Sequence, residues 1–192
     1  MTWLVIVVVA AVLLALLLIL LYNGLVRKRN RVDNAWAQID VQLKRRRDLV
    51  PNLVESVKGY AAHERGTFEA VTSARAASAA AATPAQVAAA ENMLSQALGR
   101  LFAVAEAYPE LKANQNFLDL QAQLRETEDR IAISRQVYND TVLTYNNAIQ
   151  VFPAVLVAGM LGFSRREFFA VEGTDDREPP AVSFQPDAPA TP

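Results

Sequence analysis

The sequence predicts an all-α protein in which an N-terminal transmembrane helix leads into a bundle of long helices. Three observations support this prediction: an uncharged apolar run at the N-terminus, apolar residues that recur every three or four positions, and a composition rich in Ala and poor in Gly. Apolar residues at this spacing are typical of amphipathic helices that pack on one another, and Ala is the strongest helix former.

The N-terminal run has the length of a membrane span. No residue from Met1 to Val26 is charged, and Trp3 to Leu21 is apolar without interruption. About 20 such residues cross a hydrocarbon core of about 30 Å. A cleaved signal peptide is the alternative, but the run lacks a basic start and an A-x-A-like cleavage site. We therefore predict an uncleaved anchor over residues 1–26 and a helical bundle over residues 27–152.

Basic residues follow the run directly, at Arg27, Lys28, Arg29 and Arg31. Because positive residues flank a span on its cytoplasmic side, the bundle is expected in the cytoplasm. The same four side chains lie at the height of the lipid headgroups. There we expect contact with anionic lipid, worth about 1 kcal/mol per basic residue.

Two apolar stripes define the bundle helices. The first contains Val32, Trp36, Ile39, Leu43, Val50, Leu53, Val57, Tyr60, Phe68 and Val71, with Arg46 and Glu64 as polar members. Pro51 lies inside it, so either a break before Pro51 or one long kinked helix is expected. The second stripe, from Phe117 to Phe152, predicts a helix of about 40 residues, or roughly 60 Å.

Between the stripes lies Ala-rich sequence, from Ala74 to Ala90, which predicts two helix ends that meet in a hairpin. Thr83 is the expected N-cap, Pro84 occupies the first helical position, and Gln86 completes a capping box. A low-complexity linker is the alternative. A further helix is expected to end near Ala107, with Pro109 starting the next.

Known chemistry is hard to place on this chain. There is no Cys, and His63 is the only His, so His63-Glu64 cannot complete an H-E-x-x-H zinc motif and is expected to be a polar pair on a helix surface. Neither a Gly-rich phosphate loop nor a G-x-S-x-G elbow is present. We predict a protein that is not an enzyme, with no catalytic residue, no cofactor and no metal.

The chain resembles the LemA family. The resemblance is strongest in the block Ala35-Trp36-Ala37-Gln38-Ile39-Asp40-Val41-Gln42-Leu43, and further blocks follow in order: Asp48-Leu49-Val50-Pro51-Asn52-Leu53, Val57-Lys58-Gly59-Tyr60, Tyr145-Asn146, Phe152-Pro153 and Gly162-Phe163. It implies a bacterial cytoplasmic-membrane protein with an up-and-down antiparallel four-helix bundle, and it implies little about activity. Gly66 departs from the pattern, because a helix former is expected there.

Two polar features have competing interpretations. Lys44-Arg45-Arg46-Arg47 is a basic run that could bind anionic lipid or nucleic acid. On a straight helix it lies about 30–35 Å beyond Tyr22 and its side chains point around the helix, so we favour acidic partners on neighbouring helices. The net charge of −1 gives no overall bias towards nucleic acid, and none is expected. Tyr138-Asn139 and Tyr145-Asn146 are seven residues apart and share a helix face. They predict a buried polar layer in the core, with a ligand site as the alternative.

Residues 153–171 form a short apolar segment, and residues 172–192 are expected to be a disordered, acidic and Pro-rich tail. In a four-helix bundle the last helix returns to the membrane, which places the segment at the bilayer interface. With three helices its apolar residues would need a protein partner instead. These residues are Val155, Leu156, Met160, Leu161 and Phe163.

The expected function is that of a structural, scaffolding or membrane-shaping protein, which contacts the lipid bilayer and packs laterally into a homo-oligomer. An accessory protein that binds a membrane protease or a signalling partner is the alternative. The anchor, the second interfacial segment and the lack of recognisable chemistry favour the first.

Overall fold

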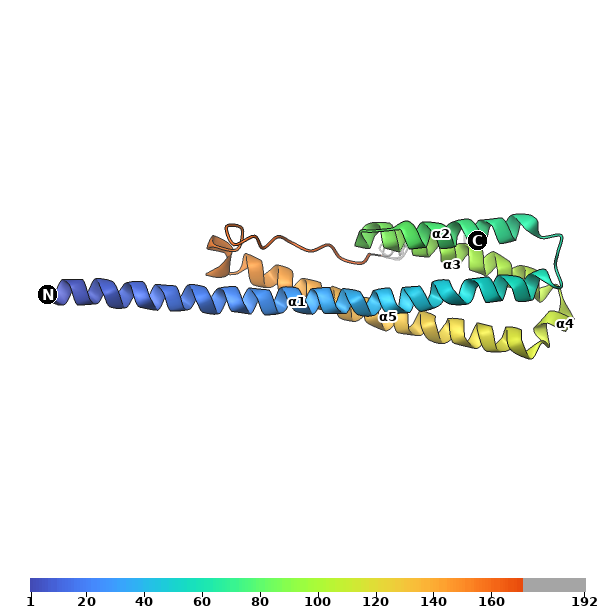
Figure 1. Cartoon of the computed structure of the whole chain (residues 1–192), viewed down its shortest axis with the longest axis horizontal. Coiled ribbons are helices and arrows are strands. Elements are labelled where there is room, and N and C mark those ends of the chain that lie inside the picture. The colour runs from blue at the N-terminus through green and yellow to red at the C-terminus, as the bar shows by residue number, and fades with distance from the viewer. Residues whose placement is uncertain (171–192) are drawn as a thin grey trace, which may run out of the picture.

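The computed structural model describes residues 1–170, and over this range the chain forms helices and no strand (Figure 1). The elements in chain order are α1 (Thr2–Lys58), α2 (Arg65–Ala80), α3 (Pro84–Glu106), α4 (Pro109–Lys112), α5 (Gln115–Gln150) and the 3-10 turn η1 (Ala154–Leu156). The predicted all-α fold is confirmed. The predicted acidic tail, residues 172–192, lies outside the described residues.

Helix α1 is one rod that begins in the apolar run and ends in the bundle. Every residue from Thr2 to Leu20 is exposed. Within residues 1–170, α1 is the one helix long and apolar enough to cross a membrane. From Leu25 onward its apolar stripe is buried, with Val32 and Ile39 as examples. The anchor and the first bundle helix are therefore continuous.

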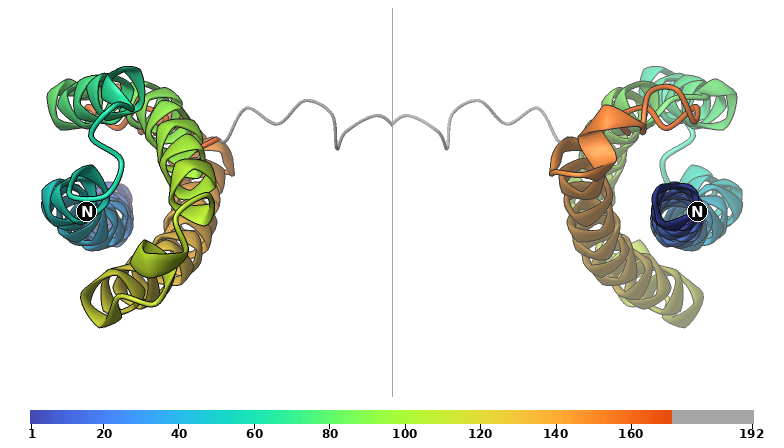
Figure 2. Two further views of the ribbon diagram at one scale, coloured as in Figure 1. Left: turned by 90° about the vertical axis from the view of Figure 1, so that its right-hand side faces the viewer. Right: turned by 90° about the vertical axis from the view of Figure 1, so that its left-hand side faces the viewer.

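Helices α1, α2, α3 and α5 alternate in direction, which makes an up-and-down bundle (Figure 1). Helix α1 packs most extensively against α5, and α2 packs against α3. In Figure 2, α2, α3 and α5 form an arc beside α1. The α2–α3 hairpin is short, so it covers only the part of α1 and α5 that lies far from the apolar run (Figure 1).

The buried apolar side chains form two clusters. The distal core, farther from the apolar run, draws on all five helices and includes Leu53, Val71, Leu101, Leu111 and Phe117. The anchor-proximal core lies mainly between α1 and α5, where it includes Ile39, Val142, Tyr145, Phe163 and Phe169. The last two residues come from beyond the final helix, so a non-helical segment completes this core.

Pro51 does not interrupt α1, which settles the alternative that the sequence leaves open. A proline inside a helix leaves the carbonyl four residues earlier without its N–H donor. Here that carbonyl belongs to Arg47, and the Arg75 side chain of α2 donates to it from Nε at 2.8 Å. A long-range contact thus replaces the missing helical hydrogen bond.

The helix ends differ from the predicted ones at two places. The first stripe predicts helix through Tyr60 and Glu64, whereas the chain leaves the helix at Gly59 and re-enters at Arg65. Pro109 starts only the short α4. Helix α5 begins at Gln115, where the Asn114 side chain accepts a hydrogen bond from the Phe117 N–H at 3.2 Å, so α5 has 36 residues rather than about 40.

The hairpin between α2 and α3 has the predicted cap. Thr83 accepts from the N–H of Gln86, and the Gln86 side chain accepts from the Thr83 N–H, which is a complete capping box. The Ala-rich sequence on both sides is helical, so the linker alternative is wrong. Small side chains at the hairpin tip let the two helices approach closely.

Candidate membrane-proximal site

Helix α5 ends where α1 emerges from its apolar run, because four alternating helices bring the chain back to its starting end. Leu25 of α1 and Ile149 of α5 both belong to the anchor-proximal core. The segment of residues 153–163 follows at once and lies beside α1. The even number of long helices therefore places this segment next to the apolar N-terminal part of α1 rather than at the far end of the bundle.

An apolar groove separates this segment from α1. Leu18, Ile19 and Tyr22 line one wall, and the other is formed by Val157, Met160 and Leu161; the groove has a volume of about 360 Å³. Leu18 and Ile19 belong to the last turns of the apolar run. Segments about 140 residues apart in the sequence thus form one apolar surface where the apolar run ends.

Four of the five predicted interfacial residues are exposed: Val155 at 50%, Leu156 at 66%, Met160 at 88% and Leu161 at 39%. Phe163 is not part of this surface, since it is only 5% exposed. Its ring packs on Tyr22, with centroids 5.7 Å apart, and lies under the Arg29 guanidinium at 5.3 Å. The packing of Phe163 thus holds residues 153–163 against α1.

The four basic residues beyond the span point in different directions. Arg29 faces the 153–163 segment, through Phe163. Lys28 and Arg31 line a shallow depression between α1 and α5, together with Asp140 and Thr144. Arg27 is exposed. Within residues 1–170 none of the four forms an ion pair, so their contact with lipid headgroups remains a prediction.

The two Tyr-Asn pairs of α5 bind the backbone of residues 164–170, which we call the strap. The Asn146 side chain donates to the carbonyl of Arg166 at 2.9 Å and accepts from its N–H at 2.8 Å. Asn139 makes the same two bonds to Phe169, at 3.1 and 2.9 Å. Each amide therefore pairs with one residue of the strap as a neighbouring β-strand would.

The tyrosines add two further bonds to the strap. The hydroxyl of Tyr138 donates to the carbonyl of Glu167, and that of Tyr145 donates to the carbonyl of Ser164, both at 2.9 Å. Seven residues of helix rise about 10.5 Å, and three residues of extended chain span about 10 Å. Because these two lengths match, side chains seven residues apart on α5 bind strap residues that are three apart. The strap therefore runs antiparallel to α5 in a fixed register.

Side chains of the strap contact α1 as well. The Phe169 ring packs on Trp36 at 6.0 Å between centroids, and Trp36 packs on Tyr138 at 5.2 Å. Arg166 pairs with Asp33 at 3.0 Å. Burial raises the pKa of both Tyr138 and Tyr145, an effect that the Arg166 charge partly offsets. Both hydroxyls therefore stay protonated and able to donate at neutral pH.

A buried polar layer separates the two cores at Arg46. Its guanidinium pairs with Glu91 of α3 at 2.8 Å and with Glu128 of α5 at 3.2 Å, and donates to Ser95 at 2.8 Å. Ser78 of α2 donates to the other oxygen of Glu91. All four long helices thus meet around one charged group that is only 4% exposed.

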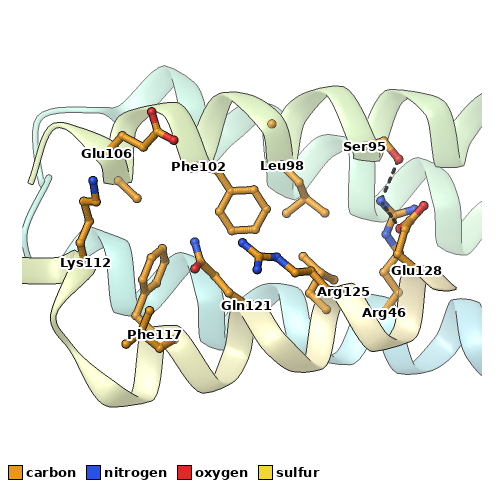
Figure 3. A pocket seen from close by; sticks show the side chains of 14 residues that line it. Arg46, Ser95, Leu98, Phe102, Glu106, Lys112, Phe117, Gln121, Arg125 and Glu128 are labelled. Carbon is orange, nitrogen blue, oxygen red and sulfur yellow. Dashed lines mark hydrogen bonds and ion pairs between the residues drawn. The ribbon is translucent and has the colours of Figure 1, made fainter. Parts of the chain in front are cut away.

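Next to this layer a cleft of about 570 Å³ opens between α3 and α5 (Figure 3). Leu98 and Phe102 of α3 face Phe117, Gln121 and Arg125 of α5 across it (Figure 3). Its walls are mixed apolar and charged, and its charges are of both signs. Within residues 1–170 no three potential metal-ligating side chains come together, at the cleft or elsewhere.

The remaining sequence predictions have plain outcomes. Arg45 pairs with Glu126 and Arg46 with Glu91, as expected of neighbouring helices, but Lys44 and Arg47 pair with Asp48 and Asp40 of α1 itself. The Arg130 side chain, hydrogen-bonded to Glu126, lowers the pKa of that carboxyl, and Arg45 adds to the effect. His63-Glu64 lies in the turn between α1 and α2, not on a helix surface.

These features define a membrane-associated, all-helical protein with one apolar N-terminal helix and a bundle attached to it. The chain belongs to the LemA family, whose model matches residues 35–184.

Several curated proteins are similar to it. Magnetosome protein MamQ of Magnetospirillum gryphiswaldense is 28% identical over 77% of this chain and 64% of its own length. Protein LemA of Metamycoplasma hominis is 28% identical over 72% of this chain and 64% of its length. Magnetosome protein MamQ 1 of Paramagnetospirillum magneticum is 38% identical over 45% of this chain and 32% of its length. The chain thus spans from about a third to just under two thirds of these relatives.

Proposed function

We propose that this LemA-family chain is a non-enzymatic membrane scaffold whose second membrane contact, residues 153–163, shapes the bilayer. The anchor holds the bundle at the surface of the cytoplasmic membrane, on its cytoplasmic side. The segment enters the interface of the same leaflet. Amphipathic or apolar segments that lie at the headgroup boundary occupy area in one leaflet only.

One observation carries this proposal: the exposed apolar residues of the segment lie beside the end of the anchor. Met160 is 88% exposed and Leu156 66%. Exposed clusters of this kind mark membrane or protein contacts. Leu18, Ile19 and Tyr22 form the groove wall on the anchor side, which supports lipid as the neighbouring medium at this height. Water there would leave the whole cluster unfavourably hydrated.

The test is a depth measurement with single nitroxide labels, which the absence of Cys makes straightforward. A label on Met160→Cys in reconstituted full-length protein is expected to be accessible to oxygen and protected from a water-soluble nickel reagent. Leu143→Cys is the matched control, an apolar residue of α5 that is 50% exposed. It should be accessible to nickel. Equal nickel access at both positions would contradict the proposal.

Membrane shaping is tested with vesicles. Wild-type protein reconstituted at increasing density should reduce vesicle diameter, and the Leu156→Ser/Met160→Ser variant should not, because polar side chains leave the interface. Cross-linking in native membranes is the test of lateral packing: a ladder of homo-oligomers is expected of a scaffold, and strictly monomeric protein would count against it.

An adaptor that binds a membrane protease or signalling partner is the second candidate. The cleft between α3 and α5 favours it, since Phe102 and Leu118 line a concave surface far from the anchor. A pull-down from detergent-solubilised membranes with wild type and with Leu98→Arg would test this candidate. A partner that is lost in the variant supports the adaptor, whereas the vesicle experiment is unaffected by this change.

A further inference from the structure

We infer that the groove between α1 and residues 153–163 is a binding site for one anionic phospholipid, with an acyl chain in the groove and the phosphate on Arg29. The inference rests on the proposed function in one respect, the position of residues 153–163 at the membrane interface. It goes beyond it by assigning a ligand class, a defined site and a residue that selects the headgroup.

The groove has the chemistry of an acyl-chain site. All its lining residues are apolar apart from the Tyr22 hydroxyl, and its volume is about 360 Å³. Taking a methylene as comparable to one water, roughly 30 Å³, it holds on the order of a dozen methylenes. Met160 contributes a flexible side chain that adapts to such a ligand. A helix is about 10 Å or more across and would not enter a space of this size.

Arg29 is connected to the groove wall through Phe163. It follows Tyr22 by seven residues, so both lie on one face of α1, about 10.5 Å apart along the axis. Phe163 connects them, with its ring 5.7 Å from that of Tyr22 and 5.3 Å from the Arg29 guanidinium carbon. The groove and the cation therefore belong to one continuous surface that crosses from hydrocarbon height to headgroup height.

The charge of Arg29 is available to a ligand. No carboxylate within residues 1–170 pairs with it. Asp33, one turn further along the same face, is already paired with Arg166 at 3.0 Å. The Phe163 ring holds the guanidinium by a cation–π contact, which leaves its N–H edge for a planar, bidentate partner such as phosphate.

A second cation lies close by in sequence. The chain turns at Gly162, which has a φ of +76°, and passes through Phe163 to the exposed Arg165. A positive φ of this size favours glycine, so the turn that delivers these residues depends on it. Arg29 has no ion pair in the described chain, and Arg165 adds a positive charge two residues beyond Phe163, so the site favours a lipid with net negative charge over a zwitterionic one.

The test uses full-length protein extracted from vesicles that contain equal amounts of phosphatidylglycerol and phosphatidylethanolamine with the same acyl chains. Native mass spectrometry should show one retained phosphatidylglycerol per chain. Arg29→Gln should lower that occupancy about tenfold, the fold-change that one charge-assisted hydrogen bond typically carries. Arg31→Gln is the matched control, with the same loss of charge on a different face, and should retain the lipid.

A second variant tests the groove itself. Val157→Trp fills it and is expected to remove the retained phosphatidylglycerol, while circular dichroism shows that the bundle remains folded. Equal losses in Arg29→Gln and Arg31→Gln would overturn the inference, because they would indicate general surface charge. Retention of phosphatidylglycerol by Val157→Trp would overturn it as well.

The label at position 160 separates this inference from the proposed function. If the label lies in hydrocarbon but no lipid is retained, the lipid site is contradicted and the proposed membrane contact is still supported. If the label lies in water, both the membrane contact and the lipid site are contradicted. Glycerophosphoglycerol is the same headgroup without acyl chains. If it displaces the retained lipid, the groove contributes nothing to binding, and the inference is overturned.

Discussion

In the distal half of the bundle the four long helices and the short α4 surround the core, whereas in the anchor-proximal half α1 and α5 form a core together with the strap. The distal core is held by one cluster of apolar side chains, to which Leu53 and Leu101 both belong. The anchor-proximal half instead adds six hydrogen bonds between α5 side chains and the strap backbone. The difference shows how a bundle is closed where two of its helices are missing.

Each half has its own means of fixing register. In the distal half ridges of apolar side chains determine how the helices fit. In the other half the seven-residue repeat of Tyr-Asn on α5 matches a three-residue repeat on the strap. Shifting the strap by one residue would place carbonyls and N–H groups away from all four side chains. The strap is therefore held in one register although it forms no strand.

The largest expected effect comes from the layer that separates the two cores. Arg46→Met should destabilise full-length protein in detergent by about 3–5 kcal/mol, because it leaves Glu91 buried without its cation. Thermal unfolding followed by circular dichroism measures this. Glu91 is 6% exposed, so water cannot take over the role of the guanidinium.

A double variant gives the control for this prediction. Arg46→Met/Glu91→Met removes both charges and should recover most of the loss, since apolar replacements of buried pairs are often neutral. Arg45→Met changes a neighbouring pair that is 40% and 47% exposed and should cost at most about 1 kcal/mol. A double variant as unstable as the single one would show that Arg46 acts through packing alone.

The next largest effect is confined to the strap. Asn146→Leu removes both hydrogen bonds to Arg166 and should weaken strap binding by about 1–3 kcal/mol. Hydrogen exchange of residues 164–170 should rise, while that of α3 stays unchanged. Asn147→Leu is the control, since Asn147 is exposed and its side chain makes no hydrogen bond within residues 1–170. Faster exchange in α3 would mean that the two cores unfold together.

A smaller effect is expected at the proline in the distal half. Arg75→Met removes the donor to the Arg47 carbonyl and should cost about 1–2 kcal/mol in thermal unfolding. In a Pro51→Ala background the backbone N–H of position 51 supplies that donor, so the same change should cost clearly less. Equal costs in the two backgrounds would show that the Arg75 bond does not substitute for the helical one.

The smallest effect concerns alkaline pH. Because burial raises the pKa of Tyr138 and Tyr145 above the unfolded value of about 10, the strap is fully held below pH 10. Above about pH 10 the two tyrosines ionise first in the state with the strap released. Strap binding therefore weakens as the pH rises through the pKa of the tyrosines in the folded protein. A nitroxide on Glu167→Cys should become mobile in this range. Tyr138→Phe/Tyr145→Phe should abolish the transition.

Periodicity predicted the helices well. The buried positions of α1 and α5 follow from the three- and four-residue spacing, and the Thr83 cap follows from a short motif whose hydrogen bonds are local. The polar member of the stripe, Arg46, was visible as an exception to the pattern. Its partners Glu91 and Glu128 were not, because no local rule relates residues 45 and 82 positions apart.

The strap was beyond sequence reasoning for a similar reason. Tyr138-Asn139 and Tyr145-Asn146 predicted a polar layer, but their partners are backbone groups, which every residue carries. The seven-residue spacing of the two Tyr-Asn pairs was the available signal. It indicates an extended partner only when the rise of seven helical residues is compared with the length of three extended residues. Phe163 looked like the other apolar residues of its segment, because burial against Tyr22 depends on the turn at Gly162.

The uninterrupted course of α1 has a mechanical consequence. Its 57 residues form a rod of about 85 Å, of which the part beyond Val26 extends about 48 Å from the apolar run. Spans tilt to fit the thickness of the lipid around them. With no flexible joint between lipid and bundle, a tilt of about 10° moves the far end of α1 sideways by roughly 8 Å. In the proposed membrane placement of α1, a change in bilayer thickness would therefore move the opening between α3 and α5 relative to the membrane surface.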